Sequence, residues 1–369
     1  MGGSAKKSAA LFTFAAHILF AHAQGLLAQS SASLADHVVW ERDFSQLNVS
    51  VTGAAVADSQ GNLWAVSDFR ESKRLVRISA DGELRLNTEL PAELKPALPA
   101  TTAMFKLAAS KSGPVALLAR YMHYVQRTVY FDGAKFSTID GGGTFGPMRS
   151  VAGPGPEYKE FVALNDEHFL AIGDQSPMTI VRINREGAVD WRRTFPASWV
   201  LPSGAALEDG SSCIVTPIYA SPQLHLIWVD KKGVTRHQEW LAGRWSVAAG
   251  SGSACAFLLD RAPSLQHSQF FLTGYDGQFK RSWTVSVLDP APPGTSYAIA
   301  ALSDGYVVSI GVRDGLFLAK YSFAGKLVWS VMDAARNQAD LIIGAGDSFF
   351  VVGADSKGHY TGLHVIRAR

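Results

Sequence analysis

The chain has 369 residues, of which 47% are hydrophobic and 18% are charged, and its formal net charge is +2. This composition excludes an intrinsically disordered protein and suits a globular chain with a sizeable core. Few charged residues and 34 glycines favour short strands joined by tight turns over long helices.

The first 23 residues are predicted to be a signal peptide. Lys6 and Lys7 supply a positive start, residues 9–20 are apolar, and residues 21–23 (AHA) fit an A-x-A cleavage site. The apolar run is short for a membrane span, although an uncleaved membrane anchor is the alternative. We therefore expect an exported protein, periplasmic or extracellular, in which residues 24–369 form a single domain without a membrane span.

Cleavage after residue 23 removes two lysines and no acidic residue, which leaves 32 basic and 32 acidic residues. The mature chain is then formally neutral. Because nucleic acids bind basic surfaces, we expect no nucleic-acid partner. Protein surfaces, glycans and small neutral ligands stay open as partners.

One pattern recurs seven times after the predicted signal peptide: a turn followed by a short apolar run with few charges. It occupies residues 59–67, 111–119, 166–174, 208–216, 250–258, 302–310 and 344–352. An apolar run bounded by turn residues is typical of a buried strand that follows a hairpin turn. The pattern therefore predicts seven buried strands in seven equivalent units.

Each copy lies within a longer unit of four predicted strands. Small residues precede it, as at 52–57, and alternating apolar and polar residues follow it, as at 179–184. A glycine turn then leads to a fourth strand that often carries a tryptophan. The turn glycines are Gly82, Gly133, Gly187, Gly233, Gly277 and Gly325, and the tryptophans are Trp191, Trp240, Trp283 and Trp329. Four antiparallel strands in about 50 residues predict one propeller blade.

The seventh copy reaches Arg369 without a fourth strand, and the other end of the chain offers a substitute. Residues 38–44 (VVWERDF) resemble residues 189–195 (VDWRRTF), which are a predicted fourth strand. We therefore expect an all-β, seven-bladed β-propeller with four-stranded antiparallel blades. Its N-terminal strand, about residues 37–44, would complete the last blade and close the ring, which removes exposed sheet edges. A β-sandwich or an open β-solenoid is the alternative.

Two short segments resemble known propeller families. Residues 58–65 (DSQGNLWA) resemble the D-x-x-G-N-L-W turn of NHL-type and gluconolactonase-like propellers. Residues 319–329 resemble the tryptophan motif of quinoprotein-like repeats, with Tyr321 and Ala324 in place of its Asp and Thr. The periodicity covers nearly the whole mature chain, but the matched residues are few in each blade. The resemblance implies the fold and says little about function.

Gly141, Gly143 and Gly146 form a G-x-G-x-x-G string, the pattern of a dinucleotide-binding turn. Such a turn must open a helix, and Pro147 and the prolines at 154 and 156 disfavour one there. We interpret residues 140–158 as a connection between blades, long enough to reach over the mouth of the ring.

Cys213 and Cys255 are the only cysteines and occupy matching positions of neighbouring repeats. Matching positions point the same way around the ring, and stacked sheets lie about 10 Å apart. This exceeds the Cα separation that a disulfide tolerates. We therefore expect two buried free thiols, although export would permit a disulfide.

The candidate ligand site is a face of the ring and not a motif. Loops between second and third strands share one face with the loops between blades, where propellers commonly bind ligands. The predicted ligand-binding residues are Arg70, Arg120, Tyr121, His123, Tyr124, Tyr219, Arg313, Asp314, His359 and Tyr360, with Phe69, Trp199, Trp245 and Tyr297 nearby. Aromatic rings with a few arginines suit a sugar, a carboxylate or a protein hot spot.

No catalytic residues are assigned, since the sequence holds no H-E-x-x-H, calcium-loop or nucleophile-elbow motif. No cofactor and no metal ligands are identified, although calcium or zinc held by scattered side chains stays open. We favour a monomeric, non-catalytic module that binds a protein or a glycan. One alternative is a metal-dependent hydrolase or lactonase of gluconolactonase-like type, and another is a periplasmic scaffold with quinoprotein-like repeats.

Overall fold

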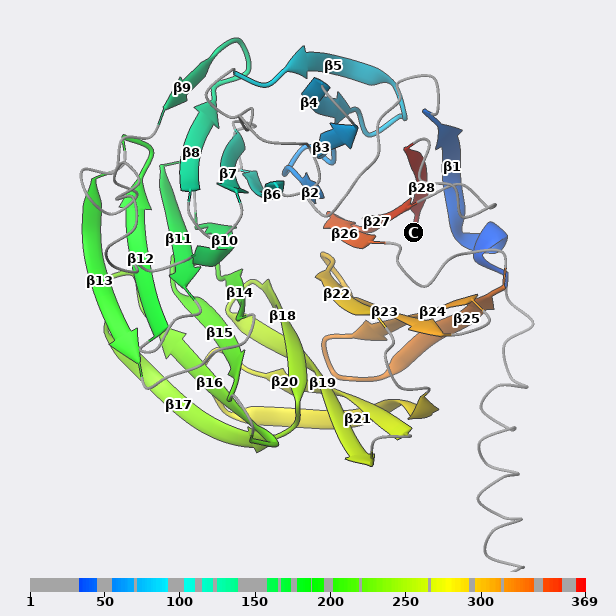
Figure 1. Cartoon of the computed structure of the whole chain (residues 1–369). Helices are drawn as coiled ribbons and strands as arrows, with labels where there is room; N and C mark the ends of the chain where they lie inside the picture. The colour runs from blue at the N-terminus through cyan, green and yellow to red at the C-terminus, as the bar shows by residue number, and fades with distance from the viewer. Residues whose placement is uncertain are drawn as a thin grey trace, which may run out of the picture.

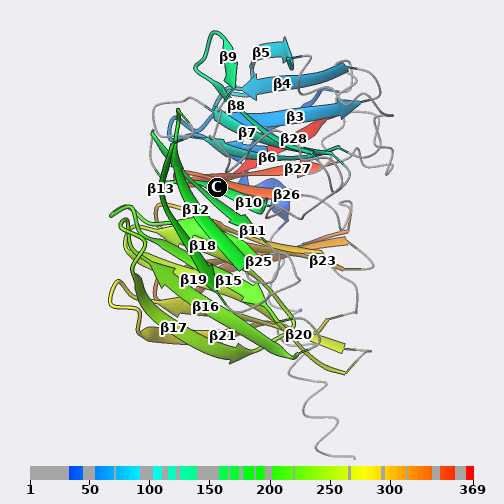
Figure 2. The ribbon, with the colours of Figure 1, turned by 60° about the vertical axis from the view of Figure 1, so that its left-hand side comes forward.

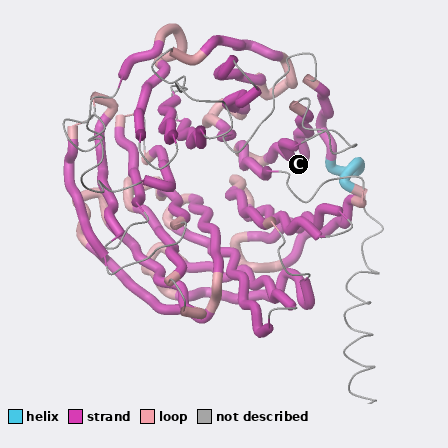
Figure 3. Tube along the Cα trace, viewed as in Figure 1, coloured by secondary structure: helices cyan, strands magenta, loops and turns pink. Residues whose placement is uncertain are grey.

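A computed structural model describes residues 33–44, 55–69, 72–91, 103–109, 115–121, 125–138, 158–164, 167–173, 178–186, 188–195, 202–218, 221–264, 267–291, 296–312, 315–334, 341–353 and 363–369. The predicted signal peptide and the glycine string at 141–146 lie outside these residues. Within them, secondary structure is almost entirely strand, with one short 3-10 helix, η1 (Leu34–His37) (Figure 3). No described helix is long and apolar enough to cross a membrane.

The described strands form seven four-stranded antiparallel sheets. The first three sheets are β2 (Ala55–Ala57), β3 (Leu63–Phe69), β4 (Ser72–Ile78) and β5 (Leu84–Glu89); β6 (Ala103–Ala109), β7 (Val115–Tyr121), β8 (Val125–Phe131) and β9 (Phe136–Thr138); and β10 (Tyr158–Ala163), β11 (His168–Gly173), β12 (Met178–Asn184) and β13 (Val189–Phe195). The next two are β14 (Ser203–Ala206), β15 (Ser212–Pro217), β16 (Gln223–Val229) and β17 (Thr235–Ala242); and β18 (Trp245–Ser251), β19 (Ala254–Ser264), β20 (His267–Tyr275) and β21 (Arg281–Ala291). The last two are β22 (Tyr297–Ala301), β23 (Gly305–Val312), β24 (Gly315–Ser322) and β25 (Leu327–Asp333); and β26 (Leu341–Ala345), β27 (Ser348–Gly353), β28 (His364–Ala368) and β1 (Val38–Asp43).

The sheets are arranged as the blades of a β-propeller. The first strand of each sheet lies nearest the centre of the ring and the fourth lies at its rim (Figure 1). The view turned by 60° shows successive sheets stacked along the ring (Figure 2). Apolar clusters fill the space between neighbouring sheets, as where Leu258 and Leu272 meet Tyr306 and Val308. The core is thus divided among the boundaries between blades.

Crowding at the centre explains the small residues of the inner strands. A Cβ added at Gly344 in β26 would lie 2.2 Å from the carbonyl oxygen of Ala301 in β22. A Cβ added at Gly250 in β18 would lie 2.5 Å from the carbonyl oxygen of Ala206 in β14. Both separations are too short for any side chain, so glycine is required where neighbouring inner strands approach each other.

The closing strand is shorter than predicted. β1 covers Val38–Asp43 rather than residues 37–44, and it pairs antiparallel with β28 in the last sheet. His37 belongs to η1, which begins at a capping box formed by Ser33 and Asp36. The backbone N–H of Arg369 donates to the carbonyl oxygen of His37 at 3.0 Å, so the two ends of the described chain are joined directly.

Three outer-strand tryptophans fasten one blade to the next. The indole N–H groups of Trp40, Trp191 and Trp283 donate to backbone carbonyls of Ala80, Lys231 and Phe323, at 2.8, 3.1 and 2.7 Å. Each ring lies on the glycine of that neighbouring turn: Gly82, Gly233 or Gly325. These glycines have positive φ, as their predicted turns require. The same three turns are the places where the tryptophan rings pack on the neighbouring blade.

The turn between β20 and β21 departs from that pattern. Its positive-φ residue is Phe279, with φ 64°, and not the predicted Gly277. The N–H of Phe279 donates to the carbonyl oxygen of Asp276 at 2.9 Å, as the glycine N–H does in the other turns. His237, in the place of the docking tryptophan, stacks on the Phe279 ring. Trp240, predicted to be a fourth-strand tryptophan of this kind, occupies a different position in β17 and is half exposed.

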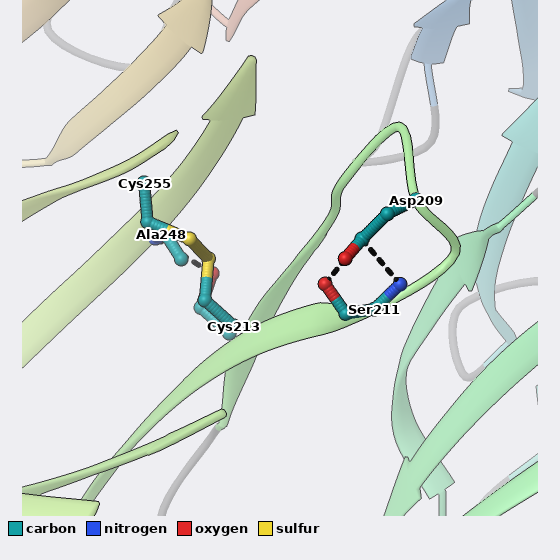
Figure 4. The surroundings of a disulfide bond; sticks show 6 residues. Asp209, Ser211, Cys213, Ala248 and Cys255 are labelled. Carbon is teal, nitrogen blue, oxygen red and sulfur yellow. Dashed lines mark hydrogen bonds between the residues drawn. A yellow bond between two sulfur atoms is a disulfide. The ribbon is translucent and has the colours of Figure 1, made fainter. Parts of the chain in front are cut away.

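The prediction of free thiols is wrong, because Cys213 and Cys255 form a disulfide with a Cα separation of 6.6 Å (Figure 4). The turn between β14 and β15 spans residues 207–211, whereas only Gly252 and Ser253 separate β18 from β19. The cysteines are therefore offset by one residue, and a one-residue shift turns a strand side chain to the opposite face. Cys213 faces the next sheet and Cys255 faces back, within one apolar cluster.

Candidate functional site: the central cavity

A cavity of 430 Å³ lies where the seven inner strands end. Its lining consists of the ends of those strands and the turns that follow them, namely residues 57–59, 109, 163–164, 206–208, 250–252, 301–303 and 344–346. Every blade contributes at least one residue. Because these residues are mostly alanine, glycine, serine and leucine, the cavity presents backbone groups and hydroxyls more than large side chains.

Backbone hydrogen bonds between neighbouring turns hold the rim of the cavity. The N–H of Glu208 donates to the carbonyl oxygen of Gly252 at 2.9 Å, and the N–H of Ser303 donates to that of Gly346 at 2.7 Å. The Glu208 side chain stays exposed. Asp58 and Glu208 are the two carboxylates among the lining residues, and these include no lysine, arginine or histidine. The described lining is therefore acidic.

Asp58 has a structural role within its own turn. Its Oδ1 accepts the backbone N–H groups of Gln60 and Asn62 at 3.0 and 2.9 Å, and its Oδ2 accepts the indole N–H of the buried Trp64 at 2.9 Å. The Asn62 amide donates to both oxygens. These bonds account for the D-x-x-G-N-L-W pattern: the aspartate organises the turn and anchors the tryptophan. Glu208 is thus the lining carboxylate that is exposed to solvent.

The cavity lies at the face of the ring opposite the predicted ligand face. Its lining turns join first to second strands, whereas the prediction used loops between second and third strands and between blades. In an antiparallel blade these two sets of connections lie at opposite ends of the strands. Sequence reasoning missed Glu208 and the cavity. The signal in the sequence that points to the cavity is the run of small residues before each turn.

Most of the predicted site residues lie outside the described part of the chain: Arg70, His123, Tyr124, Tyr219, Arg313, Asp314, His359 and Tyr360, together with Trp199. Arg120 and Tyr121 form the end of β7, where the backbone of Tyr121 pairs with Val125. Phe69 ends β3. The ligand role of these residues stays a prediction.

Two aromatic residues predicted near that face are described. Trp245 starts β18 and is 42% exposed. Tyr297 starts β22, and its ring lies 5.3 Å from that of Phe270. Burial, and secondly the nearby Asp260, raise the pKa of Tyr297. Burial also raises the pKa of Asp260 itself, against the lowering effect of a hydrogen bond with Ser268. Asp260 lies two residues beyond the predicted apolar run at 250–258, and the sequence pattern assigned it no role.

The described residues contain no group of three histidine, cysteine, aspartate or glutamate side chains that could hold a metal ion. A site for calcium or zinc built from other residues stays a prediction. The chemistry that the described cavity offers is hydrogen bonding through backbone groups, serine hydroxyls and one exposed carboxylate.

No protein-family model matches the chain, and no curated protein matches it. Several solved structures are similar to the chain. The BP39L lectin from Burkholderia pseudomallei is 14% identical, with 86% of this chain and 95% of that chain covered and a TM-score of 0.57. The WD40 domain of Toxoplasma gondii coronin is 10% identical, with 89% and 84% covered and a TM-score of 0.55. BamB from Moraxella catarrhalis is 12% identical, with 86% and 83% covered and a TM-score of 0.43.

At such low identities these similarities concern the fold alone. The similarities to the lectin and to the WD40 domain agree with the β-propeller architecture of the described sheets. The more specific assignment to NHL-like or quinoprotein-like repeats is not confirmed by them and stays a resemblance carried by residues 58–65 and 319–329.

Proposed function

We propose that the protein is an exported, non-catalytic binding module whose ligand is a glycan or a protein, and that it acts as a monomer. The central cavity carries this proposal, because a 430 Å³ space ringed by all seven blades is of a size that suits a ligand. The disulfide supports export, since disulfides persist in oxidising compartments. The predicted loop-face residues, Arg70, Arg120 and Tyr124 among them, form a second proposed contact surface.

Within this proposal we favour a glycan over a protein in the cavity. Sugar hydroxyls can donate to the Glu208 carboxylate and to backbone carbonyls, and they can accept from serine hydroxyls and backbone N–H groups. The lining offers few large apolar side chains, whereas protein hot spots are typically rich in tryptophan, tyrosine and arginine. The shared propeller fold of the BP39L lectin is compatible with glycan binding by this architecture.

The test compares two glutamate variants of the mature protein. Glu208→Gln removes the charge at the cavity, and Glu83→Gln removes one in the outer turn before β5, where Glu83 pairs with Arg85. We expect the wild type and Glu83→Gln to retain the same ligands on an immobilised glycan array. Affinity of Glu208→Gln, measured by calorimetry with the retained glycan, should fall about tenfold, the loss of one charge-assisted hydrogen bond. An array without any retained glycan, or equal affinities for both variants, would contradict glycan binding in the cavity.

The hydrolase alternative makes a separate prediction. It was motivated by residues 58–65, and Asp58 is now accounted for by its own turn. Elemental analysis of protein purified without chelator distinguishes the two functions. About one calcium or zinc per chain, with turnover of a lactone or phosphoester, would replace the binding-module proposal by the hydrolase. Absence of a stoichiometric metal is the outcome we expect.

A further inference from the structure

Trp240 combines two features that no other described tryptophan combines: it is half exposed, and one of its faces stacks on a buried histidine. Trp64 and Trp228 are fully buried, and Trp40, Trp191 and Trp283 donate their indole N–H groups to the next blade. Trp240 lies in the outer strand β17, is 50% exposed and makes no hydrogen bond through its indole nitrogen to another described residue. Among the described residues, the Trp240 side chain therefore contributes to the fold through one ring contact.

That contact fixes the plane of the indole. The His225 ring stacks on Trp240 with 4.1 Å between ring centroids and 3° between ring planes. His225 is 1% exposed, and its Nε2 lies 2.8 Å from Oε1 of Gln238. Burial lowers the pKa of His225, so the ring beneath the indole is neutral at neutral pH. One face of the indole is thus covered by a buried ring, and the exposed half of the side chain presents the other face to solvent.

We propose that the exposed face of Trp240 binds a pyranose ring by stacking. A sugar ring offers an apolar C–H face to the indole, and its hydroxyls need polar partners at the edge. Gln238 lies two residues away on the same face of β17, and because its Oε1 faces His225, its amide N–H groups are directed elsewhere and can donate to a hydroxyl. Because stacking on His225 already fixes the orientation of the indole, binding of a sugar costs little side-chain conformational entropy.

The polar surroundings favour a sugar over a peptide. Arg236, Gln238 and Glu239 share β17 with Trp240, and the first two are exposed. Protein hot spots lie in well-packed pockets from which water is excluded, whereas Trp240 lies half exposed on an outer strand. This rim site is separate from the central cavity, since β17 is an outer strand and Glu208 lies at the centre. The inference does not depend on binding in the cavity.

The test uses the mature protein with ¹⁵N-labelled tryptophan, titrated with methyl glycosides of glucose, galactose, mannose and fucose. The indole resonance of Trp240 is assigned from its loss in Trp240→Phe. We expect at least one glycoside to shift this resonance saturably while that of the buried Trp228 stays in place. Affinity should fall about tenfold in Trp240→Ala, less in Trp240→Phe, and not at all in Val328→Ala, which truncates an exposed side chain of the outer strand β25.

Three results would overturn the proposal. The first is that no glycoside shifts the Trp240 resonance. The second is that Trp240→Ala binds the same glycoside with unchanged affinity. The third is that N-acetyl-leucinamide, an apolar peptide probe, shifts the resonance as strongly as the sugars do. Glu208→Gln keeps the Trp240 response under this proposal, which separates a failure at the rim from a failure in the cavity.

Discussion

At Gly325 the missing side chain is what allows Trp283 of the preceding blade to dock. A Cβ there would lie 2.6 Å from the indole, and φ is +76°. Gly346 has a similar φ of +66° but nothing within 4 Å of its Cβ position. We expect Gly325→Ala to lower the free energy of unfolding by about 2–4 kcal/mol, through left-handed strain and overpacking together.

The Gly346→Ala variant is the control, because it adds the strain without the clash. It should cost about 1 kcal/mol. Urea titrations at equilibrium measure both, and equal losses would mean that docking of Trp283 does not depend on this glycine.

His225 predicts how stability changes with pH. Burial lowers its pKa below the ordinary value, and the hydrogen bond that Nε2 of His225 donates to Oε1 of Gln238 offsets this only in part. A depressed histidine pKa means that the unfolded chain binds the proton more readily than the folded one. The stabilisation due to neutral His225 is therefore complete above about pH 6.5, the ordinary histidine pKa, and is lost as the pH falls below it.

The urea concentration at the unfolding midpoint of the wild type should therefore decrease as the pH is lowered from about 7.5 to 5.5, because an unfolded histidine protonates over this range. His225→Gln should show a smaller fall than the wild type. His237→Gln keeps His225 and serves as the control with the dependence of the wild type. The same slope in all three proteins would show that His225 is not the titrating group.

Among the elements, hairpin turns decided which sequence predictions succeeded. The four-strand unit followed from an apolar run and a turn, which are local signals, and the described sheets contain it. The direction in which Cys255 points depended on a two-residue turn at Gly252 and Ser253, and a motif alignment cannot resolve a shift of one residue. Phe279 in a glycine position was missed for a related reason, since only the backbone shows which turn residue has positive φ.

The disulfide ties two neighbouring sheets, and its removal should weaken their boundary. Cys213→Ser with Cys255→Ser should lower the free energy of unfolding by about 2–4 kcal/mol, because the unfolded chain loses the loop constraint. Both sulfurs are buried, so the folded wild type should yield no free thiol to a thiol reagent and two after reduction in denaturant. Two free thiols in unreduced, denatured protein would contradict the cross-link.

For the whole molecule, the sequence predicted the propeller architecture better than its binding surface. Repeats along one chain reveal the blades, because each unit must bury the same faces against its neighbours. A cavity forms where parts of seven units meet, and no single segment such as residues 206–208 carries it alone. The loop face was predicted as the ligand site because propellers commonly bind ligands there. The described acidic cavity lies on the opposite face of the ring. Trp240 was noticed in the sequence as a repeat residue, and only its exposure and its stacking on His225 distinguish it.

Closure of the ring by β1 is the property that involves both ends of the chain. Trp40 in β1 is 9% exposed, stacks against Gly82 and donates to the carbonyl oxygen of Ala80, which also accepts from Arg367 of β28. One side chain therefore joins the last sheet to the first. Trp40→Ala should lower the free energy of unfolding by about 3–5 kcal/mol, the usual cost of truncating a buried aromatic residue.

Val39→Ala provides the matched control for Trp40→Ala, since Val39 is the adjacent residue of the same strand and is 55% exposed. It should change stability by less than about 0.5 kcal/mol. If β1 is the closing strand, its loosening also uncovers the edge of β28, which can then pair with another chain. We therefore expect Trp40→Ala, and not Val39→Ala, to form concentration-dependent oligomers in light scattering. A monomeric Trp40→Ala protein of wild-type stability would mean that the ring does not depend on this strand for its closure.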